Sequence, residues 1–453
     1  MKLRHKKKYP MVAVNVKIIQ ELKCFLTLIL SDSRIKEVCF EKKEDFSRKR
    51  KLGFEDTVLL ILNILKRSLK VEIQDFLEYG LKYKISYTKM AFSLQRKKIK
   101  PLVFEVWNQL LVDCFYKYYG NNVKCWKDFL LIAVDGSTAY LFDKPEIKEH
   151  FGVQINQHKD VPMARILKFY DVLNNITIFS KIAPISKGEL PILLEQIEKV
   201  PVNSISIYDR GFPSYTLMYM MNNQEQMRHF VIRAKLGFNK EVKEFVRSNK
   251  KDITLNLYPG KDAKMQLYGY GFSVLSTTAV RVRMVKVILD TGVTEVLLTN
   301  LYDCEKFETA CFKELYFKRW GIEISFCSDK NIVRMEEFSG QSVKSIEQDF
   351  QITSFILNLQ SLIEKQCEPL IEEITKDRTH KYKVNKNVSI GSMKHRLVRL
   401  FTTENPEKIL IVLQDLFLES LEPIRPGRSA PRIFRNIKKR GKCATVNNYK
   451  RVV

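Results

Sequence analysis

The stretch DFLLIAVDGS, residues 128–137, predicts a buried β-strand that ends in an acid, Asp135, followed by a glycine. Further along the chain, VNSISIYDRGF predicts a second such strand, which ends in Asp209. Between them, the apolar runs ARILKFYDVL and ITIFSKIAP flank Asn174 and Asn175, which predicts a hairpin. HFVIRAK and TEVLLTNL predict two more core strands. These short strands with helices between them indicate an α/β fold.

The rest of the chain differs in pattern from this α/β unit. Residues 11–125 show helical apolar spacing, whereas 236–290 hold short runs such as MQLYGYGF and VRVRMVKVIL, which predict an all-β insert. A long helical stretch is predicted from about 305 to 366. The predicted domains are a helical N-terminal region at 1–125, the first part of the α/β core at 126–235, a β-rich insertion at 236–295, the second part of the core with this long helical stretch at 296–375, and a C-terminal helical region with a basic arm at 376–453.

The charge of the chain indicates a polyanionic partner. Lys and Arg number 77 against 51 Asp and Glu, a net charge of +26. The segment 423–453 contains ten Lys or Arg and no acid, a composition suited to contact with a nucleic acid backbone. A second basic cluster ends a short predicted helix and comprises Arg96, Lys97, Lys98 and Lys100. It could contact DNA, as expected of an N-terminal DNA-binding region at 1–125, or form a solvated face.

Two other classes of protein are disfavoured. The longest early apolar runs are too short to span a membrane, and the first residues do not form a secretory signal. Nine cysteines without paired spacing indicate a reducing compartment and argue against a disulfide framework. The cysteines and the six histidines form no zinc pattern.

The segment ELYFKRWGIEISFCSDK, residues 314–330, mixes polar residues into a stretch that otherwise resembles core. In an unbroken helix, Tyr316, Arg319, Glu323 and Lys330 fall within about 60° of one another, on one stripe. One explanation is an exposed face stabilised by the i,i+4 pair of Arg319 and Glu323. The other explanation is that these residues form a functional site.

Three carboxylates favour the site. Asp135 and Asp209 follow strands and Glu323 lies on a helix, and in an α/β unit these three positions can converge. Each Asp alone is weak evidence, because Asp commonly follows a strand in a turn. Converging oxygen ligands are what two Mg²⁺ ions require, and two such ions activate the attacking oxygen and stabilise the leaving oxygen of a phosphodiester. Arg319 and Lys330 would then clamp the neighbouring phosphates.

This pattern resembles a known family. The spacing Tyr316, Arg319, Glu323 and Lys330 matches the Y-(2)-R-(3)-E-(6)-K signature of bacterial insertion-sequence transposases of the group numbered four. VDGS around Asp135, YDRGF around Asp209 and LLTNL before the helix resemble the other blocks of that family, in the same order. The resemblance covers roughly residues 50–370 in layout.

The resemblance implies a ribonuclease H-like catalytic core that is interrupted by a β-rich insertion. Asp135, Asp209 and Glu323 would be the catalytic triad and would bind two Mg²⁺ ions, with Mn²⁺ able to substitute. The implied activity is cut-and-paste transposition, in which a freed 3′-OH forms a hairpin before the reopened end joins target DNA. The implied partners are double-stranded DNA, at the element's terminal inverted repeats and at the target, and a second copy of the chain in a homodimer. The implied location is the bacterial cytoplasm, in association with the nucleoid, with no membrane contact.

The resemblance also implies roles in DNA binding. Tyr316, Arg319 and Lys330 would hold the terminal phosphates, and Arg210 is a weaker candidate, because a residue beside a metal ligand can instead form a structural ion pair. A flipped base would stack on Trp320 or on an aromatic residue of the insert, which has no Trp. Core packing is the alternative for each aromatic candidate in the insert, namely Tyr258, Tyr268, Tyr270 and Phe272.

Two other functions remain open for the sequence. A nuclease of the same fold would cut DNA without rejoining it. A catalytically silent regulator derived from a transposase would bind DNA only, although such a protein has no need to keep all three carboxylates at their spacing.

Overall fold

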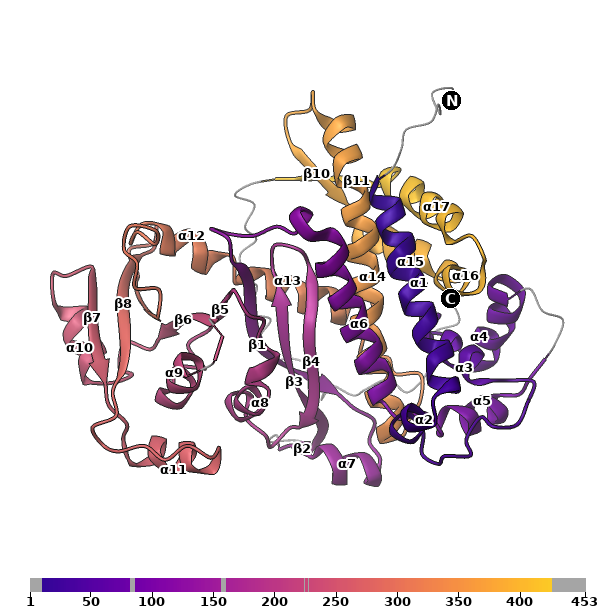
Figure 1. Cartoon of the computed structure of the whole chain (residues 1–453), viewed down its shortest axis with the longest axis horizontal. Coiled ribbons are helices and arrows are strands. Elements are labelled where there is room, and N and C mark those ends of the chain that lie inside the picture. Colours follow the sequence, from indigo (N-terminus) through magenta and orange to yellow (C-terminus); the bar gives the residue numbers. More distant parts are fainter. Residues whose placement is uncertain (1–9, 82–85, 156–159, 224, 227, 426–453) are drawn as a thin grey trace, which may run out of the picture. The chain divides into compact units, whose positions relative to one another are not determined.

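The computed structural model describes residues 10–81, 86–155, 160–223, 225–226 and 228–425 (Figure 1). It forms two compact units. The helical unit comprises residues 1–122, 140–163 and 327–453, and the sheet unit comprises residues 123–139 and 164–326. The basic arm predicted at the C-terminus lies, from residue 426 onward, outside the described residues.

The sheet unit is built on a mixed sheet with the strand order β4-β3-β1-β5-β6-β9-β8-β7, which confirms the predicted α/β class. β1, β5 and β6 are parallel to one another. Along the rest of the sheet each neighbouring pair is antiparallel, namely β6 with β9, β9 with β8 and β8 with β7. The strands are β1 (Leu130–Tyr140), β3 (Val161–Asp171), β4 (Ile176–Pro184), β5 (Ser204–Tyr208), β6 (Arg228–Ala234), β7 (Asp252–Leu257), β8 (Val280–Ile288) and β9 (Thr294–Thr299).

The predicted core strands are confirmed, with one difference in β1. The hairpin predicted around Asn174 and Asn175 is the antiparallel pair β3 and β4, and Asn175 adopts the left-handed conformation (φ 59°) that such a turn requires. β1 does not end at Asp135 but continues to Tyr140. Its parallel pairing with β5 nevertheless stops at Val134, so the acid lies just beyond the paired residues.

The segment predicted as an all-β insert is mixed. β7 and β8 are strands, as predicted, but MQLYGYGF belongs mainly to a helix, α11 (Lys261–Gly269). An alternating apolar pattern over so few residues does not separate strand from helix. The apolar residues of this run do not share one buried face of α11, since Leu267 is buried whereas Met265 and Tyr268 are exposed. The other helices of the unit are α8 (Glu189–Glu195), α9 (Tyr215–Asn222), α10 (Lys240–Arg247), α12 (Cys311–Phe317) and α13 (Trp320–Cys327).

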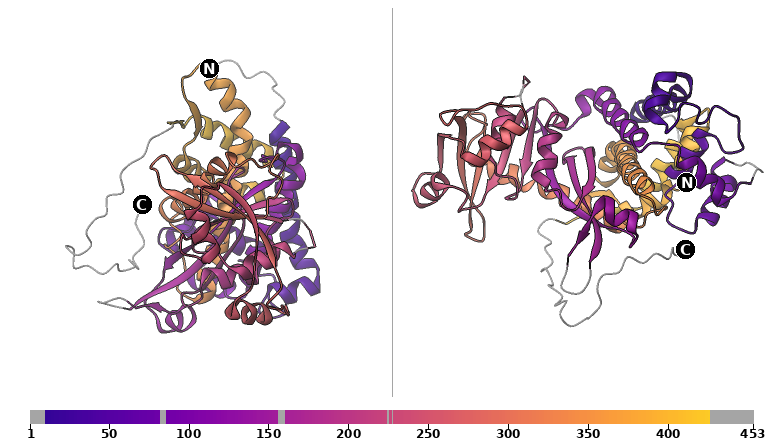
Figure 2. Two further views of the ribbon diagram at one scale, coloured as in Figure 1. Left: turned by 90° about the vertical axis from the view of Figure 1, so that its left-hand side faces the viewer. Right: turned by 90° about the horizontal axis from the view of Figure 1, so that it is seen from below.

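The helical unit is organised around one long helix, α14 (Val343–Thr375), which is seen almost end-on in the right-hand view of Figure 2. It packs against α1, α3, α6 and α17, and Trp107 of α6 stacks on its Phe355 with ring centroids 4.0 Å apart. The remaining elements are α1 (Pro10–Ser31), α2 (Ser33–Cys39), α3 (Phe54–Leu62), α4 (Leu69–Asp75), α5 (Lys89–Arg96), α6 (Leu102–Tyr119), α7 (Pro145–Phe151), β2 (Val153–Gln154), β10 (Lys381–Val384), α15 (Lys386–Met393), α16 (Arg396–Thr402), α17 (Pro406–Leu418) and β11 (Leu421–Ile424), with π-helical turns at Phe76–Leu81 and Ser328–Ile332. Over the described part of the chain, every helix is too short or too polar to cross a membrane.

The basic cluster after α5 is partly structural. Arg96 is 5% exposed, and its guanidinium donates to the side chains of Gln348 and Asp349 (2.6 and 2.8 Å) and to the backbone oxygen of Ser345 (2.9 Å). Arg96 therefore fits neither the DNA contact nor the solvated face considered for this cluster, because its charge is compensated inside the unit, where it joins α5 to α14. Lys98 stays partly exposed, 3.7 Å from Asp45.

Candidate active site

Asp135 and Asp209 lie side by side because they follow paired residues on neighbouring parallel strands. Val134 of β1 pairs with Tyr208 of β5, and both residues are fully buried. The next residue on each strand therefore emerges at the same edge of the sheet. The Asp135 side chain keeps 20% of its surface exposed, so it stays accessible.

The helix predicted to carry the Y-R-E-K residues is broken. Tyr316 lies on α12 and Glu323 on α13, and Arg319 lies between them, where its backbone N–H donates to the Tyr316 oxygen three residues back (3.1 Å). Such i→i−3 bonds tighten the chain relative to an α-helix. Lys330 lies in the π-helical turn Ser328–Ile332 after α13, and this turn belongs to the helical unit. The even 100° step assumed for the stripe therefore does not hold along the whole segment.

Arg319 links the acids of the sheet unit. It is 5% exposed, and its Nη1 lies 3.4 Å from Asp135 Oδ2 while its Nη2 donates to Glu323 Oε1 at 2.8 Å. The Tyr316 hydroxyl lies 3.3 Å from Asp209 Oδ1, and burial raises the pKa of this hydroxyl, so it remains a donor. The exposed i,i+4 pair considered from the sequence is thus a buried bridge between strand and helix.

The Arg319 guanidinium also has unused donor capacity. Its Nε is buried and has no hydrogen-bond partner among the described residues. The guanidinium carbon lies 5.7 Å from the centroid of the Tyr316 ring and 5.5 Å from that of Trp320. Two aromatic neighbours and two acids therefore hold the group in place while its Nε–H stays available.

A fourth acid, Glu189 at the start of α8, lies next to Asp135. Burial raises the pKa of Asp135 to about 6, and the charges of Glu189 and Asp209 act in the same direction, against the Gly136 N–H and Arg319. Glu189 is paired with Arg165 of β3 at 3.1 Å. It lies so close to Gly136 that a Cβ there would be 2.0 Å from the Glu189 Cδ.

The Glu189 contact was not predicted. It arises because β3 is the neighbour of β1 and because α8 follows the hairpin. The one sequence signal is the glycine directly after Asp135, where any side chain would displace Glu189.

α13 is fixed to the sheet by two contacts that place Glu323. Gly321 lies against Val172, the residue after β3, and an added Cβ would be 3.1 Å from the Val172 Cβ. Lys168 of β3 is buried and donates to Ser325 Oγ at 3.0 Å. The close approach of helix and sheet thus depends on the absence of a side chain at Gly321.

A cavity of about 630 Å³ adjoins the Y-R-E-K residues in the sheet unit. Tyr316, Arg319 and Trp320 line it together with apolar residues of the insert such as Leu289. Trp320 is 43% exposed, so its ring is available to a ligand. Stacking of a base on Trp320 stays a prediction.

The aromatic candidates of the insert lie elsewhere. Tyr258 and Tyr268 are exposed, and neither they nor Tyr270 or Phe272 are among the described residues that line the cavity. Phe272 contacts Tyr219, with ring centroids 5.7 Å apart, which corresponds to the core-packing alternative.

The two remaining candidates have different surroundings. Arg210, directly after Asp209, is exposed and forms no ion pair with any residue that the structure describes, so the structural ion pair considered for it is not seen there. Lys330 is half-buried, and its Nζ lies 3.8 Å from Glu336 within the helical unit.

The donor chemistry of the acids fits a hard divalent cation. Asp135, Asp209 and Glu323 supply only carboxylate oxygens, which Mg²⁺ and Mn²⁺ prefer. Among the described residues, no three Asp, Glu, His or Cys side chains lie close enough together to hold an ion as they stand. Arg319 bridges two of the acids, so the side chains would have to rearrange around an ion.

Comparison with known proteins gives one family. The family model described as "Transposase DDE domain" matches residues 126–359. Among curated proteins, the putative transposase InsZ of Escherichia coli is 26% identical over 112 residues, which are 24% of this chain and 38% of InsZ. The transposase InsG for insertion sequence element IS4 of the same organism is 22% identical over 221 residues, 48% of each chain. The chain thus spans about half or less of the length of these relatives, and the resemblance stated from the motifs is confirmed.

A solved structure is also similar, at a low level. A chain from the cryo-EM structure of a piggyBac transposase synaptic complex with hairpin DNA has a TM-score of 0.39 and 10% identity. The match covers 97% of this chain and 91% of that one.

Proposed function

The chain belongs to the transposase DDE domain family, and on that basis we propose that it is a DNA transposase that cleaves and rejoins phosphodiester bonds with Asp135, Asp209 and Glu323. The observation that carries the proposal is the bridge of buried Arg319 between Asp135 and Glu323, beside the Tyr316 contact to Asp209. A purely structural ion pair needs neither the two neighbouring strand-end acids nor the spare Arg319 N–H.

We infer that the core is ribonuclease H-like. The order β4-β3-β1-β5-β6, with an antiparallel hairpin followed by parallel strands, supports this inference. In such a sheet, the acids at the ends of adjacent parallel strands lie together, where a ligand can reach them. β7, β8 and the helices α10 and α11 would be the insertion between the second Asp and the Glu.

Asp135, Asp209 and Glu323 would hold the divalent cation, Mg²⁺ or Mn²⁺. When bound, two such ions polarise the phosphodiester and generate the attacking oxygen. The protein keeps the acids at the edge of the sheet and screens their mutual repulsion with Arg319. Because burial raises the pKa of Asp135, loss of its proton on cation binding is part of the expected behaviour.

The DNA contacts follow from donors that are still available. Arg319 would give its free Nε–H to a phosphate at the element end, and exposed Arg210 would bind a neighbouring phosphate. Tyr316 would orient Asp209. Lys330 is proposed as a further phosphate contact once it leaves Glu336, and Trp320 would stack on a base that enters the cavity beside it.

The wider reaction is proposed from the family. The relative InsG is named for an insertion sequence, so we propose that this chain acts on the terminal inverted repeats of a similar element and joins them to target DNA. A homodimer would bring two ends together, and a hairpin intermediate is proposed for the cleaved end.

The test uses a labelled duplex that carries the element's own end sequence. Wild type should nick it with Mg²⁺ and not with EDTA, and should then transfer the end into a plasmid, as read on denaturing and native gels. Glu323→Gln should bind the duplex and leave it uncut. Glu308→Gln is a matched control, since Glu308 is an exposed acid shortly before α12 that does not line the cavity beside Trp320.

Each other outcome corresponds to another function. Cleavage without transfer would indicate a nuclease, and binding without any cleavage would indicate a silent regulator. Cleavage by Glu323→Gln at the wild-type rate would refute the proposed triad.

A further inference from the structure

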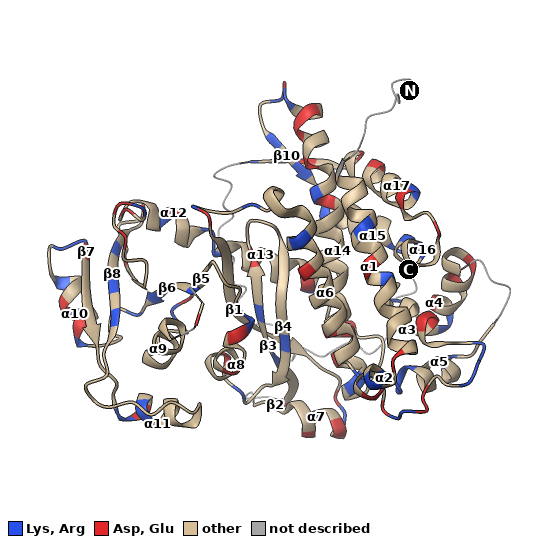
Figure 3. Ribbon diagram, viewed as in Figure 1, with Lys and Arg blue, Asp and Glu red and all other residues tan. Residues whose placement is uncertain are grey.

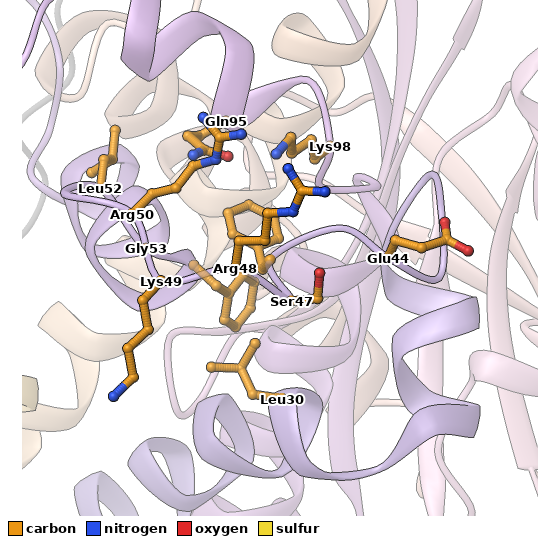
Figure 4. Close-up of a pocket in the computed structure, with 12 residues that line it drawn as sticks. Leu30, Glu44, Ser47, Arg48, Lys49, Arg50, Leu52, Gly53, Gln95 and Lys98 are labelled. Atoms are coloured by element: carbon orange, nitrogen blue, oxygen red, sulfur yellow. The ribbon is translucent and has the colours of Figure 1, made fainter.

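The helical unit has a cavity of its own at the loop between α2 and α3. Its volume is about 630 Å³. Figure 4 shows it with its basic residues, and Figure 3 shows that this part of the chain carries both signs of charge. The cavity is lined by Leu30, Glu44, Phe46, Ser47, Arg48, Lys49, Arg50, Leu52, Gly53, Phe54, Gln95 and Lys98.

The loop that forms this basic cavity is held in place. Phe40, Phe46 and Phe54 pack as a cluster, with centroids 5.1 to 5.6 Å apart. The backbone N–H of Glu41 donates to the Lys98 oxygen at 2.9 Å, which ties the loop to the end of α5. The cavity is therefore formed by packed structure before any ligand arrives, which lowers the entropy loss on binding.

The charges at the cavity are largely uncompensated. Arg48, Lys49 and Arg50 are exposed and form no hydrogen bond or ion pair with any residue in the described ranges. Figure 4 shows Arg48 and Arg50 extending to the side of the loop where Gln95 and Lys98 lie, whereas Lys49 points away. Two guanidinium groups without a partner among the described residues thus face one cavity, beside Lys98, whose ammonium group lies 3.7 Å from Asp45.

Gln95 supplies an independent observation. It is 7% exposed and lines the cavity, and its Oε1 has no hydrogen-bond partner in the described part of the chain. A buried amide without a partner is unfavourable, and native proteins seldom leave one unless a bound group completes it. The oxygens of an anionic ligand only accept hydrogen bonds, so the amide must present its NH₂ to such a ligand, in the orientation that exchanges Oε1 and Nε2.

We propose that the basic cavity binds a backbone phosphate of duplex DNA, with Arg48 and Arg50 as charged donors, Lys98 beside them and the Gln95 amide at the floor. The proposal rests on DNA being the substrate, as proposed above, and adds a contact in the helical unit. A polyanion is favoured over a single small anion because the basic run continues past the cavity through Lys51. Arginine forks match phosphate oxygens in geometry.

The experiment compares two double variants of the full chain. Fluorescence anisotropy with a labelled duplex gives the dissociation constant over a series of salt concentrations. Arg48→Gln/Arg50→Gln should weaken binding roughly tenfold at low salt and reduce the slope of log K against log salt by about one to two. Lys42→Gln/Lys43→Gln removes the same charge from exposed positions of the same loop that do not line the cavity, and should change the slope by less than about 0.5.

A second variant separates binding from folding. Gln95→Met keeps the size of the side chain and removes the unpaired oxygen, so the melting temperature should stay the same or rise. Affinity for the duplex should fall by about three- to tenfold, the value of one hydrogen bond. A lower melting temperature with unchanged affinity would show a structural role for Gln95 and overturn its place in the proposal.

The outcomes separate this inference from the proposed function. If wild type binds and cleaves DNA but the two double variants behave alike, the phosphate site is refuted and the transposase stands. If wild type does not bind duplex DNA at all, both are refuted.

Discussion

Removing the charge of Asp252 should loosen the insert and the segment that carries Tyr316. Arg283 of β8 is fully buried, and it donates from Nε and Nη2 to Asp252 of β7 at 3.0 and 2.5 Å and from Nη1 to the Leu301 oxygen at 2.8 Å. Asp252 also accepts a hydrogen bond from Thr309 at 2.8 Å, just before α12. The pair thus joins two strands of the insert to the entry of α12.

The magnitude follows from the burial of Arg283. Asp252→Asn leaves a buried guanidinium without its counter-charge, which costs about 3–5 kcal/mol in comparable pairs. Hydrogen exchange followed by mass spectrometry should show β7 and β8 exchanging faster by roughly a hundredfold to a few thousandfold. Glu244→Gln is the control, because Glu244 pairs with Lys240 on the exposed surface of the same insert, where such a pair contributes about 0–0.5 kcal/mol.

The same pair predicts a dependence on pH. Partial burial favours the neutral acid, but hydrogen bonds from Arg283 and Thr309 outweigh it and lower the pKa of Asp252. An acid whose pKa is lowered by folding stabilises the folded state fully at a pH above its pKa in the unfolded chain, near about 4. This stabilisation is lost as the pH falls through the pKa of the folded state. Protection of β8 should therefore decline below about pH 4 in wild type, and Asp252→Asn should lack this decline. Equal exchange in wild type and Asp252→Asn, or an equal loss in Glu244→Gln, would refute the reasoning.

Three substitutions at the site give further predictions, each measured by end cleavage and by duplex binding. Gly136→Ala should reduce cleavage because its Cβ would lie 2.0 Å from the Glu189 Cδ, and the Glu189→Ala background should remove most of the loss; an unchanged loss would place the effect elsewhere. Gly321→Ala should move α13 away from Val172, 3.1 Å from the new Cβ, and reduce cleavage, while Val172→Ala in addition should restore part of it. Arg319→Lys keeps the charge but loses the Nε–H and the fork that reaches Asp135 and Glu323 from separate nitrogens, so cleavage should fall on the order of tenfold or more, while binding should weaken less because one phosphate contact among several is lost; full activity would show that charge alone suffices.

The strand-based part of the fold could be predicted because its signals are local. Continuous apolar runs that end in an acid, and an asparagine pair between two runs, indicate strands and a hairpin wherever they occur. The choice between strand and helix at 261–269 could not be made locally, since both conformations satisfy a short alternating run. There, packing decided in favour of α11.

The candidate site could likewise be predicted only in part. The proximity of Asp135 and Asp209 follows from strand ends alone, whereas the close packing of α13 depends on the contact between Gly321 and Val172, which are distant in the chain. An even helical step cannot describe a segment with 3₁₀-type bonds on one side and a π-helical turn on the other. The partners of Arg96 and Glu189 come from elements distant in the chain, so no spacing rule indicates them.

The register between β1 and β5 has an evolutionary consequence. Backbone hydrogen bonds, not side chains, set Asp135 beside Asp209, so the chain between these two strands can gain or lose residues in its turns while the acids keep their spacing. A one-residue insertion within β5 itself would instead rotate Asp209 to the opposite face of the sheet. Lineages related to this chain are therefore expected to vary in length around α7 and α8 and to show no length variation within Ser204–Tyr208.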